Sequence, residues 1–522
     1  MYSRNYLLVV GTGLALLGAA ACNNDKLTSI NKNPNSPEDV PAASIFTNAS
    51  RTMVARWIGN GYDLRGTEWV VQHLAEVQYP DEDDYKRLQA SSTQTWFDSP
   101  YTSELEDFRK IIQKGRSTSD AGTWAPAAIL RVLDFAYLTN SFGDVPYAQS
   151  LAGDSLGSTL TPLYDTQQAI YTDLFKQLDD ASKALSSASN SLGGADPIYG
   201  GSPAAWQKLA NSLRLRLAMQ IVNVDAATAG TQIAAALAAP GGVFATNADN
   251  AQLNWPGDGV YNNPWSDNFS GRDDHRMSQT FMNLLLGLND ARVTVFATPT
   301  VQDTTLNAAF PNYAGMPNGL VQATAQPYFN DTSRPGLIFW PPANLSAVNG
   351  GTGKTTPTFV MTYAEVSFIK AEAANRGLGG LTAGQAAAFY SAGIAASFEQ
   401  WGLAVPPGYM AQSSVAYTPG TPGLVLIDQQ EWIALFTDGG TTWSLWRRTC
   451  VPNTVKPGPN AITQIVPRRF EYSPTEYQVN QSEVTAATNR QGPDLLTTAM
   501  WWDKNWNDPS KVPTYTTNCG SR

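Results

Sequence analysis

The sequence is poor in the residues on which most catalytic and metal-binding motifs depend. Its 522 residues include only two histidines, His73 and His275, which are 202 positions apart and belong to no HExxH or zinc-ligand pattern. Histidine-based metal binding or triad catalysis is therefore not expected. Three cysteines cannot form a disulfide framework, and the sequence leaves open whether Cys450 and Cys519 pair outside the cytoplasm.

Charge is also sparse along the chain. Charged residues make up only 15% of the sequence, and 34 basic against 44 acidic side chains give a net charge of −10. Nucleic-acid binding requires a basic patch that meets the phosphates, so we expect no nucleic-acid partner. After the first 21 residues, no apolar run approaches the roughly 20 residues that a membrane-spanning helix needs.

A short apolar run near the N-terminus ends abruptly at a cysteine, in ALLGAAACNNDKL (15–27). The run follows Arg4 and is too short to span a bilayer, as in a secretory signal. LGAAAC resembles a bacterial lipobox, although Ala19 stands where leucine is usual. Cleavage by ordinary signal peptidase is the alternative. We favour a lipoprotein signal peptide at residues 1–21, lipid attachment at Cys22 and a lipidated polar tether at 22–36, with no cofactor besides this covalent lipid.

Aromatic residues are abundant by comparison. The chain contains 15 Trp, 21 Tyr and 19 Phe, together with 42 Gly and 33 Pro. Exported proteins that bind neutral polar ligands such as sugars often have this composition, because aromatic faces stack on C–H surfaces. Most individual rings are nevertheless expected in the core. The composition therefore favours a neutral ligand only slightly.

Apolar residues at helical spacing predict a mostly α-helical chain in two blocks. Three early helices begin near residues 124, 164 and 203, about forty residues apart, which suggests degenerate helix-pair repeats of the tetratricopeptide type. Between the blocks, residues 240–358 are rich in Gly, Pro, Asn and aromatics, and so long a loop region is usually functional. Helices are predicted from an N-cap at Ser36 and at 95–114, 124–139, 164–185, 203–221, 278–287, 363–376, 385–401 and 426–436.

Several short motifs have structural interpretations. Thr362 and Glu365 form a capping-box pattern at the start of 363–376. FGDVPY (142–147) is typical of a helix terminator, in which Asp144 is a turn or cap acceptor rather than a catalytic acid. Core positions are expected for Trp432, Phe436 and Trp443, and structural ion pairs for Arg447 and Arg448.

Two apparent ligand motifs do not meet their patterns. NGGTGKTT (349–356) resembles a phosphate-binding loop, but Val348 replaces the first glycine and no strand–loop–helix context is evident. PDEDDY (80–85) has carboxylates but lacks the glycine and the closing glutamate of an EF-hand, so it does not support calcium binding.

The best candidate for a ligand site lies in LNWPGDGVYNNPWSDNFSGRDDHR (253–276). Proline and glycine interrupt this stretch, so its aromatics cannot all belong to one helical stripe. The alternative is that these rings fix a long loop to the scaffold. A second candidate is the stretch 77–89, whose acidic cluster is otherwise a solvated charge run, and a third is the FWPP turn. The candidate ligand-binding residues are Trp255, Tyr261, Asn262, Trp265, Arg272 and Asp273 in the first stretch, Tyr79 and Tyr85 in the second, and Trp340 in the third.

Six stretches, in order along the chain, resemble the SusD/RagB family of outer-membrane lipoproteins and its SusD-like subgroup. They are LTSINKNPNSPEDV (27–40), LTNSFGDVPYAQSL (138–151), WQKLANSLRLRLAM (206–219), MTYAEVSFIKAEAANRG (361–377), GIAASFEQWG (393–402) and QQEWIALFTDGGTTWSLWRRT (429–449). The resemblance implies one mostly helical SusD-like domain at 37–522. Its tetratricopeptide-like scaffold would comprise about 37–222 and 361–449, and its loop-rich, ligand-binding insert about 240–358.

The same resemblance implies a function without catalysis. Proteins of this family sit at the cell surface over a TonB-dependent, SusC-like outer-membrane barrel and act as its lid, capturing glycans or oligopeptides. Two alternatives come from the residues themselves. The 44 acidic side chains could supply the paired carboxylates of a secreted helical glycoside hydrolase, and a repeat scaffold could serve only to dock partner proteins.

Overall fold

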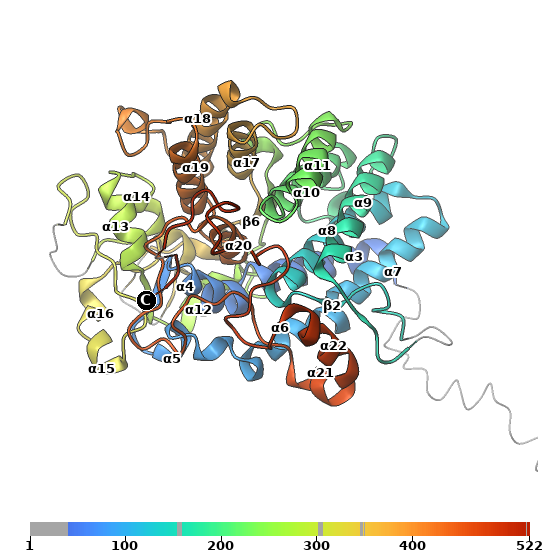
Figure 1. Ribbon diagram of the computed structural model, residues 1–522, viewed down its shortest axis with the longest axis horizontal. Helices are drawn as coiled ribbons and strands as arrows, with labels where there is room; N and C mark the ends of the chain where they lie inside the picture. The colour runs from blue at the N-terminus through green and yellow to red at the C-terminus, as the bar shows by residue number, and fades with distance from the viewer. Residues whose placement is uncertain are drawn as a thin grey trace, which may run out of the picture.

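The computed structural model describes residues 40–153, 159–300, 306–344, 348, 350–517 and 519–521. The predicted signal peptide, Cys22, the tether and the helix start at Ser36 lie outside these residues. The chain is mostly α-helical with a few short strands, which confirms the predicted fold class (Figure 1). Within the described residues, no helix is long and apolar enough to cross a membrane.

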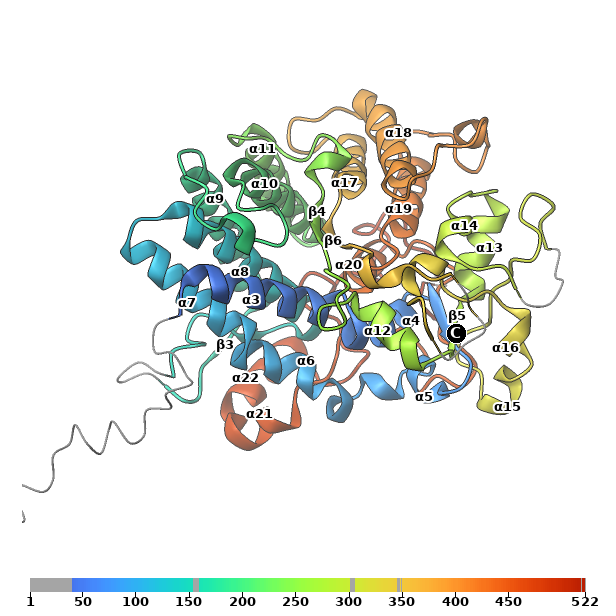
Figure 2. The same ribbon diagram turned by 180° about the vertical axis from the view of Figure 1, so that it is seen from behind.

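A row of packed helices forms the scaffold, and it joins the two helical blocks that the sequence predicts. Neighbours in the first block pack in chain order, and α10 then packs against α17 of the second block. Figures 1 and 2 show the resulting arc of helices along one side of the molecule. Its members are α3 (Ala42–Trp57), α7 (Glu104–Ser117), α8 (Ala121–Phe142), α9 (Gln167–Leu185), α10 (Pro203–Gln220), α11 (Ala226–Ala238), α17 (Tyr363–Asn375), α18 (Ala383–Gln400), α19 (Thr421–Ala434) and α20 (Gly439–Thr449).

Side-chain caps explain where several of these helices begin. Ser202 accepts a hydrogen bond from the Ala205 amide at the start of α10, with Pro203 in the first turn, as predicted. Thr362 caps α17 in the same way through the Glu365 amide. The reciprocal half of the predicted capping box is wrong. The buried Glu365 carboxylate instead accepts hydrogen bonds from Arg216 of α10 (Oε2 to Nη2, 2.6 Å), because a charge at this depth needs a charged partner.

The predicted single helix at 95–114 is also wrong, because the chain forms two helices there. Helix α6 (Ala90–Thr102) ends before Ser103, whose φ of −133° and ψ of −102° are not helical. Pro100 lies in the last turn of α6 and lacks the N–H that would continue the ladder. Helix α9 begins three residues later than predicted, since Tyr164–Asp165 pair as β3 with β2 (Val145–Pro146).

The predicted helix terminator is confirmed at the end of α8. Gly143 follows the helix with a φ of +87°, which glycine adopts without strain. Asp144 accepts a hydrogen bond from the Gln167 amide at the start of α9 (2.9 Å), so it is a cap acceptor as expected. The turn thus connects the end of α8 to the beginning of its neighbour.

The loop-rich half lies on the opposite side of the molecule and contains short elements (Figure 1). Strands β4 (Ala251–Leu253) and β6 (Thr358–Met361) pair and bring together the ends of the predicted loop region. Strands β1 (Leu74–Glu76) and β5 (His275–Met277) are antiparallel, with Glu76 opposite His275. Short helices in and around this half are α4 (Glu68–Val70), α5 (Pro80–Asp83), α12 (Pro264–Gly271), α13 (Gln279–Gly287), α14 (Val293–Phe296), α15 (Gln322–Ala325) and α16 (Tyr328–Asp331).

The remaining elements are short or lie near the C-terminus. Helices α21 (Pro474–Val479) and α22 (Gln481–Gln491) pack near α6 and β3. Single turns and irregular helices complete the chain: η1 (Asn60–Thr67), η2 (Lys86–Leu88), η3 (Gly193–Ala195), η4 (Asn247–Asp249), η5 (Leu337–Phe339), η6 (Gly353–Thr355) and η7 (Tyr409–Ala411).

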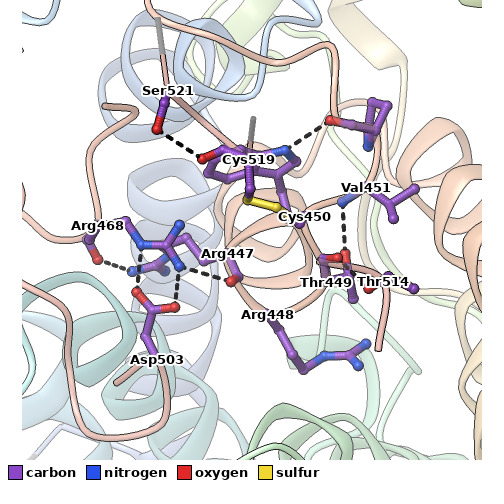
Figure 3. Close-up of a disulfide and its surroundings, with 12 residues drawn as sticks. Arg447, Arg448, Thr449, Cys450, Val451, Arg468, Asp503, Thr514, Cys519 and Ser521 are labelled. Carbon is purple, nitrogen blue, oxygen red and sulfur yellow. Dashed lines mark hydrogen bonds and ion pairs between the residues drawn. A yellow bond between two sulfur atoms is a disulfide. The ribbon is translucent and has the colours of Figure 1, made fainter. Parts of the chain in front are cut away.

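One large hydrophobic core runs through both halves and includes Trp432, Phe436 and Trp443, as predicted. A disulfide joins Cys450, at the end of α20, to Cys519 near the C-terminus, with 5.6 Å between their Cα atoms (Figure 3). It answers the question that the sequence left open about these two cysteines.

The two arginines before the disulfide have different roles. Arg448 forms the predicted ion pair, with Glu372 of α17. The ion-pair prediction for Arg447 is wrong, because its guanidinium donates to the carbonyls of Arg468 (2.7 Å) and Asn140 (2.8 Å) and stacks on Trp443. Burial lowers the pKa of Arg447 to about 9.

Candidate functional site

The three candidate tryptophans lie in the core, and each indole N–H has a protein acceptor. Trp255 donates to Thr358 Oγ1 (2.9 Å), Trp265 to Asp63 Oδ2 (3.0 Å) and Trp340 to the Pro335 carbonyl (2.8 Å). None of the three is more than 6% exposed. In this structure Trp265 fixes the loop region to η1, while Trp255 and Trp340 bind within the loop region, and protein covers the faces on which a ligand would stack.

Two polar candidates also bind other parts of the protein. Asn262 accepts from the Gly259 amide (3.0 Å) and donates to Asp267 (2.8 Å), so it shapes the loop before α12. Asp273 forms ion pairs with Arg334 and Arg276. Tyr85 is buried, in contrast to Tyr79 only six residues earlier.

Two candidate tyrosines remain open to solvent, and a guanidinium covers one face of each. Tyr79 is 52% exposed, and Arg272 lies 4.6 Å from its ring centroid. Tyr261 is 42% exposed, and Arg51 of α3 lies 4.4 Å from its ring centroid. Such cation–π contacts hold a ring in place while leaving its other face free.

These two pairs lie at opposite ends of one short helix. Tyr261 precedes α12 and Arg272 follows it, and eight helical residues span about 12 Å. Figure 2 shows α12 between α3 and α5 on one side of the molecule. We call the surface formed by Arg51, Tyr79, Tyr261 and Arg272 the α12 face. It is the best candidate for a ligand-binding site.

Arginines gather around one buried carboxylate beside Tyr79. Glu82 of α5 accepts from Arg65 (Nε, 3.4 Å), Arg87 (Nη1, 2.5 Å) and Arg272 (Nη2, 3.3 Å). The three guanidiniums remain partly exposed, from 21% for Arg272 to 44% for Arg87. The cluster therefore presents positioned N–H donors next to an open aromatic ring.

Asp274 also binds the Arg272 guanidinium, which reaches Glu82 as well. The Arg272 Nε atom donates to Asp274 Oδ2 at 2.7 Å. Burial opposes ionisation of Asp274, but the neighbouring His275 and Arg272 outweigh it and lower the pKa of this carboxyl below its usual range. Hydrogen bonds to Asp274 and Glu82 together keep Arg272 over the Tyr79 ring.

Among the described residues, the carboxylates near the α12 face that could bind a metal have protein partners. Glu76, Asp274 and His275 have suitable donor atoms close together, but both carboxylates have protein partners: Arg272 and His275 bind Asp274, and the Gln78 and Tyr79 amides donate to Glu76. In the PDEDDY stretch, Asp81 and Asp84 pair with Lys86, while Asn318 and Gly319 donate to Asp83. Protein partners thus account for these carboxylates without calcium.

A second candidate is a pocket of about 410 Å³ beside the disulfide. It contains amides and hydroxyls suited to a neutral hydrogen-bonding ligand, but no aromatic ring, and for that reason it ranks after the α12 face. No motif in the sequence indicates it. Its polar lining comprises Gln279, Thr280, Asn283, Gln429, Asn453, Thr454, Thr514 and Thr516.

Sequence reasoning missed three arginines of the α12 face and its surroundings. Arg87 lies inside the second candidate stretch, and its basic charge next to the acidic cluster could have indicated an ion pair there. Arg51 and Arg65 lie on α3 and η1, far from either stretch in sequence. Only the fold brings them to Tyr261 and Glu82.

Comparisons with known proteins agree on one family. Residues 34–473 match the SusD-like family model described as "Starch-binding associating with outer membrane". No curated protein sequence matches the chain at a significant level.

Solved structures cover nearly the whole chain. A chitin-binding protein is 27% identical with a TM-score of 0.75, covering 89% of this chain and 100% of its own. A chitin-binding SusD homologue from Flavobacterium johnsoniae is 25% identical with a TM-score of 0.71, covering 89% and 98%. A SusD homologue from Bacteroides uniformis, at 24% identity and a TM-score of 0.74, covers 89% and 100% and supports the fold.

Proposed function

The chain belongs to the SusD-like family, and on this premise we propose that it is a cell-surface lipoprotein that binds glycans for a TonB-dependent outer-membrane transporter. The match over residues 34–473 supports binding rather than hydrolysis, so we do not favour the glycoside hydrolase alternative. The observation that carries the ligand site is the half-exposed Tyr79 ring, fixed by Arg272 among partly exposed guanidiniums.

The ligand class follows from the chemistry of the α12 face. An open tyrosine face stacks on the C–H surface of a sugar, and guanidinium N–H groups donate to its hydroxyls. The two chitin-binding relatives and the starch-binding description of the family support a neutral glycan over a peptide. Because the cation–π contact and the ion pairs already order these side chains, binding loses little conformational entropy.

Export and anchoring complete the proposal. The Cys450–Cys519 disulfide is typical of proteins outside the cytoplasm. Lipid attachment at Cys22 would hold the protein at the outer membrane, and a SusC-like barrel beneath it would take up the captured glycan. The Cys22→Ala variant should then move from the membrane to the soluble fraction. Retention in a strain that lacks the barrel would contradict lipid anchoring.

The ligand proposal is tested by titration calorimetry of the mature chain with chitohexaose and with maltohexaose. We expect one of these glycans to bind, and Tyr79→Ala to weaken that binding about fivefold or more, since one stacking contact of about 1 kcal/mol or more is lost. Tyr477→Ala is the matched control, because Tyr477 is 38% exposed and lies on α21, away from the α12 face.

Different outcomes separate the alternatives. Equal losses in the Tyr79 and Tyr477 variants would refute a site at the α12 face. Loss in Asn283→Ala alone would move the site to the pocket beside the disulfide. Binding of peptides with no response to either glycan would overturn the ligand class.

Purification of the tagged protein from native outer membranes in mild detergent tests the transporter partner. A barrel recovered in stoichiometric amount is the expected result. An anchored protein that brings no barrel would instead be a free-standing surface binder.

A further inference from the structure

Three buried carboxylates meet in the scaffold, far in sequence from the residues of the α12 face. Glu372 belongs to α17, while Asp428 and Glu431 lie three residues apart on α19, which packs against α17. Their exposures are 0%, 0% and 4%. One oxygen of each carboxylate lies within 4.8 Å of the other two. A cluster of three acids this deep in a protein requires compensation.

The arginines in the cluster compensate only one of the three acids. Both oxygens of Glu372 accept hydrogen bonds from Arg448 (2.5 and 2.8 Å), and Oε1 also accepts from Arg376 Nε (2.8 Å). Among the described residues, neither oxygen of Asp428 has a hydrogen-bond partner, and neither does Oε2 of Glu431. With all three carboxylates ionised, the two guanidiniums would leave the group with one negative charge. Glu365 nearby is already paired with Arg216.

We propose that a hard cation of the Ca²⁺ class binds between Glu372, Asp428 and Glu431 and fastens α19 to α17. The unpartnered oxygens are the ligand type that such ions prefer, at distances of about 2.3–2.6 Å. The three ligand oxygens lie no more than 4.8 Å from one another, so there is a point within about 2.8 Å of all three, since 4.8/√3 is 2.8. Small side-chain movements therefore bring three of the six to eight oxygens that such an ion takes to coordination distance.

Proton uptake is the competing explanation for the unpartnered oxygens. Burial raises the pKa of both Asp428 and Glu431 well above the usual range, and Arg448 opposes that rise only in part. Neutral carboxylic acids would then need no cation. The two explanations differ in how amide variants and added calcium affect the protein.

The experiment uses the full mature chain, dialysed against EGTA and then against a Ca²⁺ solution. After the free ion is removed, metal analysis should find one bound Ca²⁺ per chain. Dialysis against EGTA should remove this ion. The melting temperature should rise by about 2–4 °C on adding Ca²⁺. Asp428→Asn and Glu431→Gln keep the shape of each side chain and should each lose the bound ion and this thermal shift. Glu76→Gln alters the other cluster of metal-type ligands and should retain both.

Two results would overturn the cation site. The first is a wild-type chain that retains no metal and melts at the same temperature with and without Ca²⁺, while Asp428→Asn is equally or more stable. That result would assign protons to the cluster. The second is bound Ca²⁺ that persists in both amide variants or disappears in Glu76→Gln, because the ion would then lie elsewhere.

Discussion

Reducing the Cys450–Cys519 disulfide should destabilise the protein by about 4 kcal/mol. The bridge closes a loop with a sequence separation of 69, and the loop-closure entropy for that length corresponds to about 4 kcal/mol at 25 °C. Both cysteines are at most 2% exposed, so both thiols of the reduced chain stay buried in the folded state. The loss therefore arises mainly in the unfolded state, which gains conformational freedom.

The assay is urea unfolding, followed by tryptophan fluorescence, of a chain that begins at Asn23 and thus has only these two cysteines. Oxidised and dithiothreitol-reduced protein have the same sequence and differ only at this cystine, so their difference reports the cross-link. The reduced form should also show a larger dependence of unfolding free energy on urea, because its unfolded state exposes more surface.

The double variant Cys450→Ala/Cys519→Ala should not respond to dithiothreitol, which controls for other effects of the reductant. A difference below about 1 kcal/mol between the oxidised and reduced chains would refute the loop-closure reasoning. So would an equal response of the double variant, since it has no disulfide to reduce.

Two further predictions concern buried charges. Burial raises the pKa of Asp83 to about 7 despite three N–H donors, so the folded chain keeps a proton that the unfolded chain loses near pH 4. As the pH rises from 4 to 7, the unfolding free energy should fall more steeply in the wild type than in Asp83→Asn. The difference in slope should be at most about 1.4 kcal/mol per pH unit. Parallel profiles of unfolding free energy against pH, measured with urea, would contradict this. Arg216→Met leaves Glu365 buried without its partner and should cost about 3–5 kcal/mol in the same assay, whereas adding Glu365→Gln should recover much of the loss. No recovery in the double variant would mean that Arg216 acts through packing.

The sequence predicted much of the scaffold well, because the interactions that begin and end its helices join residues close together in the chain. The caps at Ser202 of α10 and Thr362 of α17 follow from side chains that accept hydrogen bonds from amides three residues away. The helix break at Ser103 was missed because the apolar spacing continues across it. Only Pro100 marked the interruption.

The candidate site depends on contacts between distant segments, which a pattern in one stretch cannot reveal. Tyr79 and Tyr85 flank the same acidic cluster, yet one is 52% exposed and the other 1%. Arg272, almost two hundred positions later, covers one face of Tyr79. The sequence could therefore indicate both tyrosines as candidates but could not distinguish them.

The sequence allowed two interpretations of the aromatic residues near α12, anchoring of the loop and ligand binding. Each interpretation applies to different rings. Trp265 lies on the buried side of α12 and donates to Asp63 of η1, which fixes this helix to the segment that follows α3. The exposed tyrosines lie at the two ends of the α12 face, each held by an arginine from a distant segment. A ring whose position is already determined loses little entropy when a ligand stacks on it. The buried Trp265 thus holds the exposed tyrosines in position for binding. Substitution of Trp265 or of either tyrosine should therefore weaken binding of the same ligand.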